Sequence, residues 1–314
     1  MRNGKHMSFD VLMDWSCVKI DPNQSALISE KPHTAAKFGM LDGAHGGAGT
    51  DTLSISDASN NAYSLPTSAN ISGIENIVVS HTSDAIGDSV TVNANTLTDA
   101  RSITVSNSGT AAPIDIDTTE NVTSVTVNGD AVNADITTVA IDDNGTAATA
   151  TAAGTDVLAS VTVMGTTGAV AIASDVIDTL SLTGVAGVTT VTDATTTSTR
   201  ALTINYGAGT VGGVTDAGAD TVTINMTGAG TNIGTTTIAQ ATTVDLNAEF
   251  AITTGTIAAT SATAVNISGD SVAAVDLSTA ATGAVTISGS AGFTDTTTGT
   301  AASFTNSGTG AMTL

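Results

Sequence analysis

Beyond residue 50 the chain repeats one short pattern, in which apolar and polar residues alternate over about five positions before a Gly, Asn or Asp. Successive side chains on a β-strand point to opposite faces, so this pattern places apolar residues on one face and Ser or Thr on the other. Val, Ile and Thr also favour strands, whereas Gly, Asn and Asp favour turns. The pattern predicts short strands with one buried face, each given with the turn residue that ends it where there is one, at residues 102–106, 124–129, 160–165, 179–184, 202–205, 222–225, 244–247, 265–269 and 285–289.

These segments recur at a nearly constant interval. From Val161 to Val285, the first apolar residues of consecutive segments are 19, 22, 20, 22, 21 and 20 residues apart. A second, weaker set follows about ten residues after the first and includes residues 114–116, 139–141 and 170–172. A sustained period near 21 residues is typical of a protein built from stacked repeats.

Two strands in each period predict an all-β protein. We expect a right-handed parallel β-solenoid with coils of about 21 residues, whose two sheets face each other across a narrow core. The alternative is a tandem pair of immunoglobulin-like β-sandwiches, which also have a strand about every 8–12 residues. Such sandwiches anchor each core on a large aromatic residue. Aromatic residues are 3% of this chain and share no common register, so we favour the solenoid.

The composition changes near residue 40. Residues 1–40 contain five of the seven Lys and Arg residues, while residues 41–314 contain 25 acidic residues and only Arg101 and Arg200 as basic ones. We therefore divide the chain into a basic, non-repetitive leader or cap at residues 1–40 and an acidic, Thr/Ala/Gly-rich solenoid at residues 41–314.

The formal net charge of −22 excludes several kinds of partner. A field of this sign repels nucleic acid and anionic membrane surfaces. No stretch approaches the roughly 18 consecutive apolar residues of a membrane span. The same field attracts cations, above all a hard, oxygen-binding cation. We therefore expect Ca²⁺ as the cofactor, and neither a nucleic-acid partner nor a membrane span.

One segment has a specific cation-binding pattern. Residues 46–54, GGAGTDTLS, match the calcium-binding nonapeptide G-G-x-G-x-D-x-(apolar)-x at every fixed position. The glycines allow tight turns whose carbonyl groups can face an ion, and the aspartate offers a carboxylate. The expected ligands are Gly47, Gly49 and Asp51. A glycine-rich turn that simply opens the first strand is the alternative.

The same region resembles a known family. The segment GTDTLSI at residues 49–55, followed by ISGIENIVV at residues 71–79, is similar to a strand pair of RTX-type bacterial surface-layer (S-layer) proteins. The resemblance is specific over residues 46–79, and residues 80–314 share only its composition and rhythm. It implies a β-solenoid, calcium-dependent assembly in two dimensions, and type I secretion to the extracellular face of a bacterial cell.

Three acidic pairs are further candidate calcium sites or contacts between copies: Asp115 with Asp117, Asp142 with Asp143, and Asp84 with Asp88. Asp115 and Asp117 are two residues apart on a predicted strand, so their carboxylates leave the same face and can share one cation. For each of these residues a solvated turn position is the alternative.

The sequence does not support catalysis. Parallel β-helix enzymes that act on polysaccharides generally need clustered carboxylates beside Arg or Lys, and here Arg101 and Arg200 are 99 residues apart. No nucleophile elbow, phosphate-binding loop or dinucleotide fingerprint is present. We expect a non-catalytic structural protein of a bacterial extracellular assembly, either a surface layer or a filament. Its main partner is another copy of itself, with cell-surface polysaccharide as a further partner.

An adhesin or an ice-binding solenoid is the alternative function. Pairs of outward Ser and Thr side chains on successive strands can stack into a flat hydroxyl array. The alternative explanation of these pairs is structural, because Ser and Thr suit the solvent-facing side of a strand. The pairs are Ser89/Thr91, Ser102/Thr104, Ser124/Thr126, Ser160/Thr162 and Thr221/Thr223.

Overall fold

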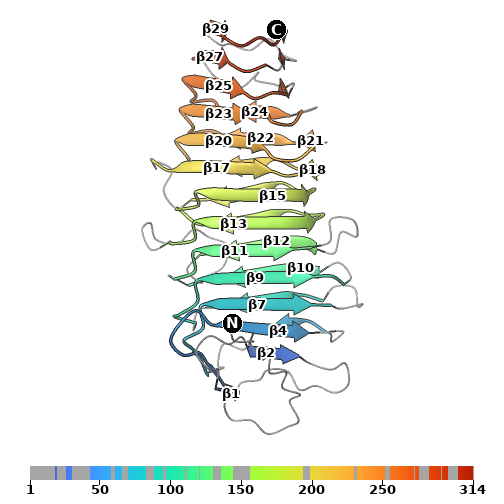
Figure 1. The fold of residues 1–314 in the computed structure, drawn as a ribbon, viewed down its shortest axis with the longest axis vertical. Helices are drawn as coiled ribbons and strands as arrows, with labels where there is room; N and C mark the ends of the chain where they lie inside the picture. The colour runs from blue at the N-terminus through green and yellow to red at the C-terminus, as the bar shows by residue number, and fades with distance from the viewer. Residues whose placement is uncertain are drawn as a thin grey trace, which may run out of the picture.

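The computed structural model describes residues 18–19, 26–29, 43–57, 61–65, 70–82, 88–94, 97–109, 112–119, 121–129, 136–143, 156–193, 199–229, 232–251, 255–271, 273–275, 283–290, 292–295 and 303–313. All regular structure in these residues is β-strand, and no helix occurs among them. The strands form coils that stack along one long axis, from the N-terminal to the C-terminal end (Figure 1). Every described strand pairing is parallel, as the predicted β-solenoid requires.

The first ladder contains the strands that carry the main repeat. Each strand in it pairs with the strand of the preceding and the following coil. Its members in order are β2 (Ala26–Ser29), β4 (Thr52–Asp57), β7 (Asn76–His81), β9 (Ser102–Asn107), β11 (Ser124–Asn128), β13 (Ser160–Thr166), β15 (Thr179–Val185), β17 (Ala201–Tyr206), β20 (Thr221–Met226), β23 (Thr243–Asn247), β25 (Ala264–Ser268), β27 (Ala284–Ile287) and β29 (Ser303–Asn306).

The second ladder lies on another side of the coil and contains the weaker set of strands. Its members are β5 (Tyr63–Ser64), β8 (Val90–Asn93), β10 (Ala112–Asp117), β12 (Ile136–Asp142), β14 (Val170–Ala173), β16 (Thr189–Thr192), β19 (Val214–Asp216), β22 (Thr235–Ile238) and β24 (Thr256–Ala258). Three small sheets complete the described coils: β1 (Val18–Lys19), β3 (Gly43–His45) and β6 (Asn70–Ser72); β18 (Thr210–Val211) and β21 (Asn232–Ile233); and β26 (Ala273–Val275), β28 (Phe293–Asp295) and β30 (Met312–Thr313).

The core is narrow because each coil contributes the inward residues of short alternating strands. In β11, Val125 and Val127 are buried while Ser124, Thr126 and Asn128 are partly exposed. The same alternation recurs in most strands of both ladders, so aliphatic side chains stack on like side chains along the axis. Burying such side chains is the main favourable term in folding. The alternation read from the sequence therefore accounts for the core.

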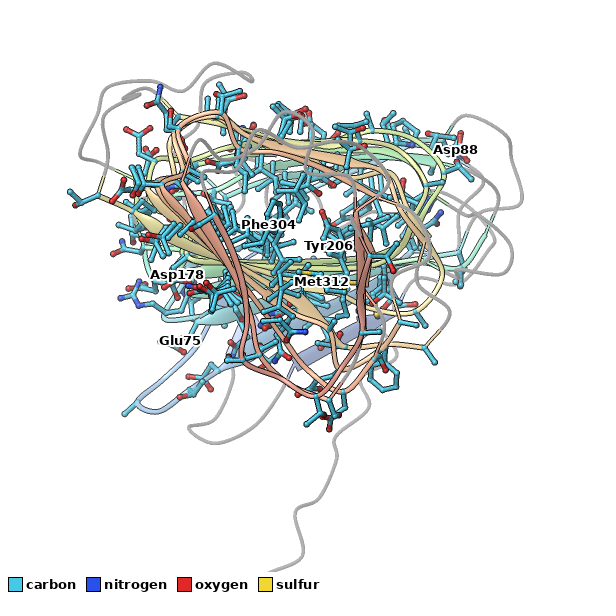
Figure 2. The ribbon with its side chains drawn as sticks, turned by 90° about the horizontal axis from the view of Figure 1, so that it is seen from above. Glu75, Asp88, Asp178, Tyr206, Phe304 and Met312 are labelled. Carbon is cyan, nitrogen blue, oxygen red and sulfur yellow. The ribbon has the colours of Figure 1, made fainter. Side chains whose placement is uncertain are left out.

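Figure 2 looks down the axis and separates the inside of the coil from the outside. Tyr206 and Phe304 lie within the outline of the coil, whereas Glu75 and Asp178 lie at its outer edge. The hydroxyl of Tyr206 forms a 2.7 Å hydrogen bond with Thr236, which gives the buried phenol a polar partner.

Partners in neighbouring coils are about 22 residues apart, close to the predicted period of about 21. The predicted spacing aligned Leu180 with Leu202, but Leu180 pairs with Ile204. A shift of two residues keeps the same face inward, so both alignments bury the aliphatic residues. The longest step is that from Val125 to its partner Val161, 36 residues further on.

The sandwich alternative is wrong because immunoglobulin-like sandwiches are built from antiparallel sheets, and the described pairings here are parallel. The described parts of residues 1–40 join the stack: β1 pairs with β3 and β2 pairs with β4. The stacked region therefore includes some residues before the composition change at residue 40. Within the described residues, no helix has the length and apolar character of a membrane-crossing segment.

Candidate functional site

The glycine-rich motif at residues 46–54 begins as a hydrogen-bonded corner and continues into β4. The Asp51 side chain is 0% exposed, and its Oδ2 accepts a 2.9 Å hydrogen bond from the backbone N–H of Gly47. Its Oδ1 has no hydrogen-bond partner among the described residues. Gly49 has a φ of 127°, a conformation that favours glycine. The structure thus brings together the three predicted residues of the motif, with Asp51 holding the turn through one oxygen.

Acidic side chains of the following coils also accept hydrogen bonds from backbone N–H groups. Oε2 of Glu75 accepts a 2.7 Å hydrogen bond from the Asp51 N–H, and Oδ2 of Asp99 accepts one of 2.7 Å from the Gly73 N–H. Each carboxylate therefore satisfies a backbone donor of the coil before it. The sequence analysis missed the roles of Glu75 and Asp99, although Glu75 lies inside the segment that carries the family resemblance.

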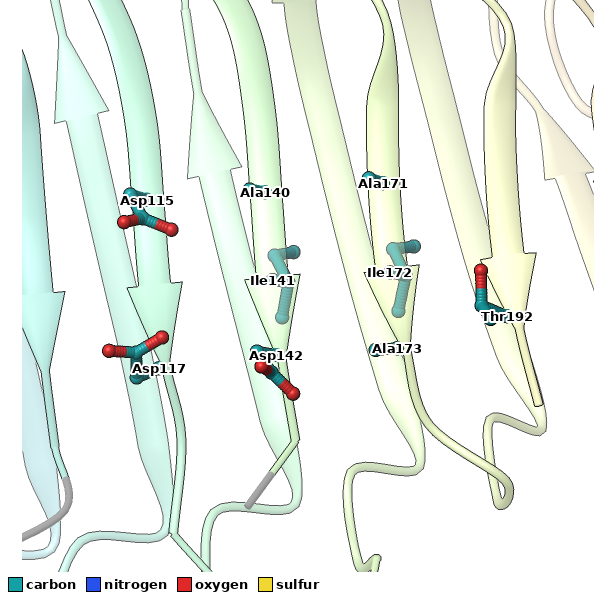
Figure 3. A pocket seen from close by; sticks show the side chains of 9 residues that line it. All are labelled: Asp115, Asp117, Ala140, Ile141, Asp142, Ala171, Ile172, Ala173 and Thr192. Carbon is teal, nitrogen blue, oxygen red and sulfur yellow. The ribbon is translucent and has the colours of Figure 1, made fainter. Parts of the chain in front are cut away.

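A groove of about 340 Å³ lies on the second ladder, across β10, β12, β14 and β16 (Figure 3). Small side chains form its floor, because Ala140 and Ala171 stand in the same cross-strand row as Asp115. In the next row, Asp117 pairs with Asp142, which pairs with Ala173. Three of the predicted site residues, Asp115, Asp117 and Asp142, therefore meet in one groove.

Asp142 is the most enclosed of the three carboxylates. It is 4% exposed, and neither of its carboxylate oxygens has a hydrogen-bond partner among the described residues. Burial raises the pKa of Asp142 to about 6. Neighbouring carboxylates act in the same direction, in decreasing order those of Asp117, Asp143, Asp156 and Asp115.

Asp117 is partly exposed beside it. Burial also raises the pKa of Asp117, and the charge of Asp115 adds to the rise. A 2.8 Å hydrogen bond from Asn93 Nδ2 to Asp117 Oδ2 acts in the opposite direction. Asp115 is exposed on the outer face of β10. The groove therefore contains three carboxylates whose ionised forms repel one another.

Asp143, the residue predicted to pair with Asp142, has a structural role. It is 2% exposed, and its carboxylate accepts hydrogen bonds from the N–H groups of Val157 and Leu158 at 2.8 and 2.7 Å. The hydroxyls of Thr118 and Ser174 each donate a further hydrogen bond of 3.0 Å. These bonds join Asp143 to residues 157–158 further along its own coil and to Thr118 and Ser174 in the coils before and after it. Asp143 therefore faces a full set of donors, and the structure separates its environment from that of Asp142.

A second acidic cluster, which the sequence analysis missed, contains its own cation. Nη2 of Arg200 lies 2.8 Å from Asp193 Oδ2 and 2.6 Å from Asp216 Oδ2, with all three side chains almost fully buried. Nη1 of Arg200 donates a 2.8 Å hydrogen bond to the carbonyl of Ile177. Burial raises the pKa of Asp193 to about 6, although Arg200 acts in the opposite direction. The sequence signal for this cluster is that Arg200 is one of only two basic residues in the acidic region 41–314.

The first ladder carries rows of short polar side chains on its outer face. One row aligns Ser102, Ser124, Ser160, Thr179, Thr203 and Thr223, and the next aligns Thr104, Thr126, Thr162, Ser181, Asn205 and Asn225. Three predicted pairs, Ser102/Thr104, Ser124/Thr126 and Ser160/Thr162, are therefore adjacent. Thr91 instead belongs to β8 on the second ladder, and Thr221 pairs with Ala201 outside both rows. Ser89 immediately precedes β8.

No three His, Cys, Asp or Glu side chains of the described residues already stand close enough together to coordinate a metal ion. The groove also has no Arg or Lys among its described lining residues. Comparisons of the chain with protein families, with curated proteins and with solved structures find no match.

Proposed function

We propose that this chain is a non-catalytic structural protein of a bacterial extracellular assembly, the subunit of a surface layer or a filament, and that calcium stabilises it. The observation that carries the proposal is the solenoid itself, a stack of coils whose first ladder aligns Ser, Thr and Asn in rows on its outer face. Regular faces of this kind suit repeated contacts between identical copies.

Side-chain entropy supports this proposal. Ordering long side chains such as Lys or Arg at an interface costs about 0.5–1.5 kcal/mol each. Residues 41–314 contain only two basic residues, and the rows on the first ladder contain short side chains. Contacts between such faces therefore lose little conformational entropy.

The charge explains the need for calcium. Two copies with a formal charge of −22 each repel one another. Bound divalent cations lower this repulsion and offer coordination positions to carboxylates. The resemblance of residues 46–79 to RTX-type surface-layer proteins supports the same cofactor and a place on the bacterial cell surface reached by type I secretion. Cell-surface polysaccharide is the further partner that such a place would supply.

Electron microscopy of the full chain tests this proposal. We expect ordered sheets or filaments with CaCl₂, which disperse when EGTA is added, and no such order with NaCl of the same ionic strength. A monodisperse monomer at high protein concentration with calcium contradicts the proposal.

A second candidate, an adhesin or ice-binding module, is favoured by the two aligned rows on the first ladder. Six consecutive coils, from Ser102 to Thr223, place a hydroxyl in one row. Successive hydroxyls then repeat at the strand spacing of about 4.8 Å. Thermal hysteresis in solution, or retention on a glycan array, would favour this candidate over pure assembly. The absence of both would exclude it.

A further inference from the structure

We infer that Asp115, Asp117 and Asp142 bind one Ca²⁺ ion in the groove across β10 and β12, at a site separate from the motif at residues 46–54. This inference rests on the calcium dependence in the proposed function and adds the location of a site.

The strand geometry brings the three carboxylates within reach of one ion. Asp115 and Asp117 leave the same face of β10, and Asp117 is the cross-strand partner of Asp142. Residues two apart on a strand are separated by about 6.6 Å, and neighbouring strands by about 4.8 Å. Aspartate side chains at the corners of such a triangle can turn toward one central ion. Figure 3 shows Asp115 and Asp117 along one strand of the groove, and Asp142 on the neighbouring strand, level with Asp117.

The burial of Asp142, without a hydrogen-bond partner among the described residues, favours a bound cation. Leaving a buried carboxylate without a hydrogen-bond donor or a counter-charge is costly, so buried carboxylates are normally paired or coordinate a metal. Asp142 is 4% exposed, lines the groove, and has two oxygens without a partner among the described residues. Asp143, one residue further on, accepts four hydrogen bonds. The contrast shows that the chain can satisfy a buried carboxylate at this corner and does not do so for Asp142.

No side chain described near the groove supplies the opposite charge. Arg200 is bound to Asp193 and Asp216, and Nη1 of Arg101 donates to the carbonyl of Ala100. The charges that act most strongly on Asp142 are other carboxylates. An external cation is therefore the group that the local electrostatics favour.

The shape of the groove favours calcium over magnesium. Ca²⁺ takes about six to eight oxygen ligands in flexible geometry. Mg²⁺ requires a compact octahedron and usually keeps several of its water ligands. Three aspartates can provide up to about six carboxylate oxygens. The groove has a volume of about 340 Å³, which leaves space for water beside the carboxylates.

Isothermal titration of CaCl₂ into the chelator-treated full chain tests this site. Asp142→Asn removes the buried carboxylate, and Asp115→Asn removes an exposed one that has no role in the core. Asp178→Asn is the matched control, because it removes the same charge from an exposed position outside the groove. We expect both groove variants to weaken binding at this site by about tenfold or more. Asp178→Asn should change it by less than about twofold.

Several results would overturn the inference. The inference is wrong if Asp142→Asn and Asp115→Asn bind Ca²⁺ as tightly as Asp178→Asn does. It is also wrong if the wild type binds Mg²⁺ as tightly as Ca²⁺. Binding that is lost in Asp51→Asn but retained in both groove variants would place the calcium at residues 46–54 instead. Denaturant unfolding in EGTA checks that Asp142→Asn is folded. We expect its unfolding midpoint to equal or exceed that of the wild type, which would show that weaker calcium binding does not come from misfolding.

The titration and the electron microscopy can reject the calcium site and the proposed function separately. Calcium binding in the groove without sheets or filaments in the microscope would contradict the assembly. Calcium-dependent assembly with unaltered binding in the groove variants would contradict only the site.

Discussion

Two acidic clusters on the second ladder solve the same electrostatic problem in different ways. At β16 and β19, Asp193 and Asp216 are buried together with Arg200, which binds both carboxylates. At β10 and β12, Asp115, Asp117 and Asp142 share a groove with no Arg or Lys among its described lining residues. Where the chain supplies its own cation, the acids are closed into the protein. Where no described Arg or Lys lines the site, the acids border a groove instead.

The largest expected effect comes from removing the internal cation. Arg200→Met leaves Asp193 and Asp216 buried without a counter-charge, and breaking a buried ion pair in this way costs about 3–5 kcal/mol. Urea unfolding of the wild type and the variant at pH 7.5 measures the loss. Adding Asp193→Asn and Asp216→Asn to Arg200→Met should restore part of it, because no unpaired charge then remains. A loss below about 1 kcal/mol for Arg200→Met alone would contradict the role given to this cluster.

A smaller effect is expected from protonating the groove. Asp142 has a pKa of about 6 in the folded chain against an ordinary value of 3.8, so the folded state binds more protons between these two pH values. The free energy of unfolding must then fall as the pH rises through this window, and rise again on acidification. In EGTA we expect the wild type to gain on the order of 1 kcal/mol between pH 7.5 and pH 5, after allowance for solvent screening.

The control for this prediction is Asp142→Asn, which keeps the raised pKa of Asp193 and removes that of Asp142. Its gain on acidification should be smaller than that of the wild type when thermal unfolding is followed in EGTA at both pH values. Equal gains in the two proteins would show that the groove does not contribute. Adding CaCl₂ at pH 7.5 should stabilise the wild type, as acidification does in EGTA.

The smallest effect is expected for an acid outside both clusters. Asp245 lies on the outer face of β23 and accepts a 2.7 Å hydrogen bond from Asn266 Nδ2. Asp245→Asn should change the free energy of unfolding by less than about 0.5 kcal/mol, as is usual for surface positions. Urea unfolding at pH 7.5 and pH 5 checks this. A loss comparable with that of Arg200→Met would show that burial does not distinguish the clusters.

The repeat could be predicted from the sequence because it depends on local alternation. Val161 and Val163 are apolar at positions i and i+2, and this alone places them on the buried face. The same logic placed Asp115 and Asp117 on one face of a strand, which the register of β10 confirms. Local patterns therefore fixed the ladders and one side of the groove.

The meeting of Asp117 with Asp142 could not be predicted in the same way. It depends on the lengths of the turns between β10 and β12, because one residue more or less would move Asp142 to another row. The pairing of Arg200 with Asp193 and Asp216 depends on how the chain returns between coils. The different roles of Asp142 and Asp143, neighbours in sequence, depend on the hydrogen-bond donors of residues 157–158. Contacts between coils, rather than patterns within one strand, decide these points.

The claim that an external cation completes the groove is tested most directly by anomalous X-ray diffraction from crystals of the full chain soaked in a lanthanide that substitutes for calcium. We predict a strong anomalous peak between Asp115, Asp117 and Asp142, and none between Asp193 and Asp216, where Arg200 already lies. A groove without a peak, in crystals that bind the lanthanide elsewhere, would contradict it.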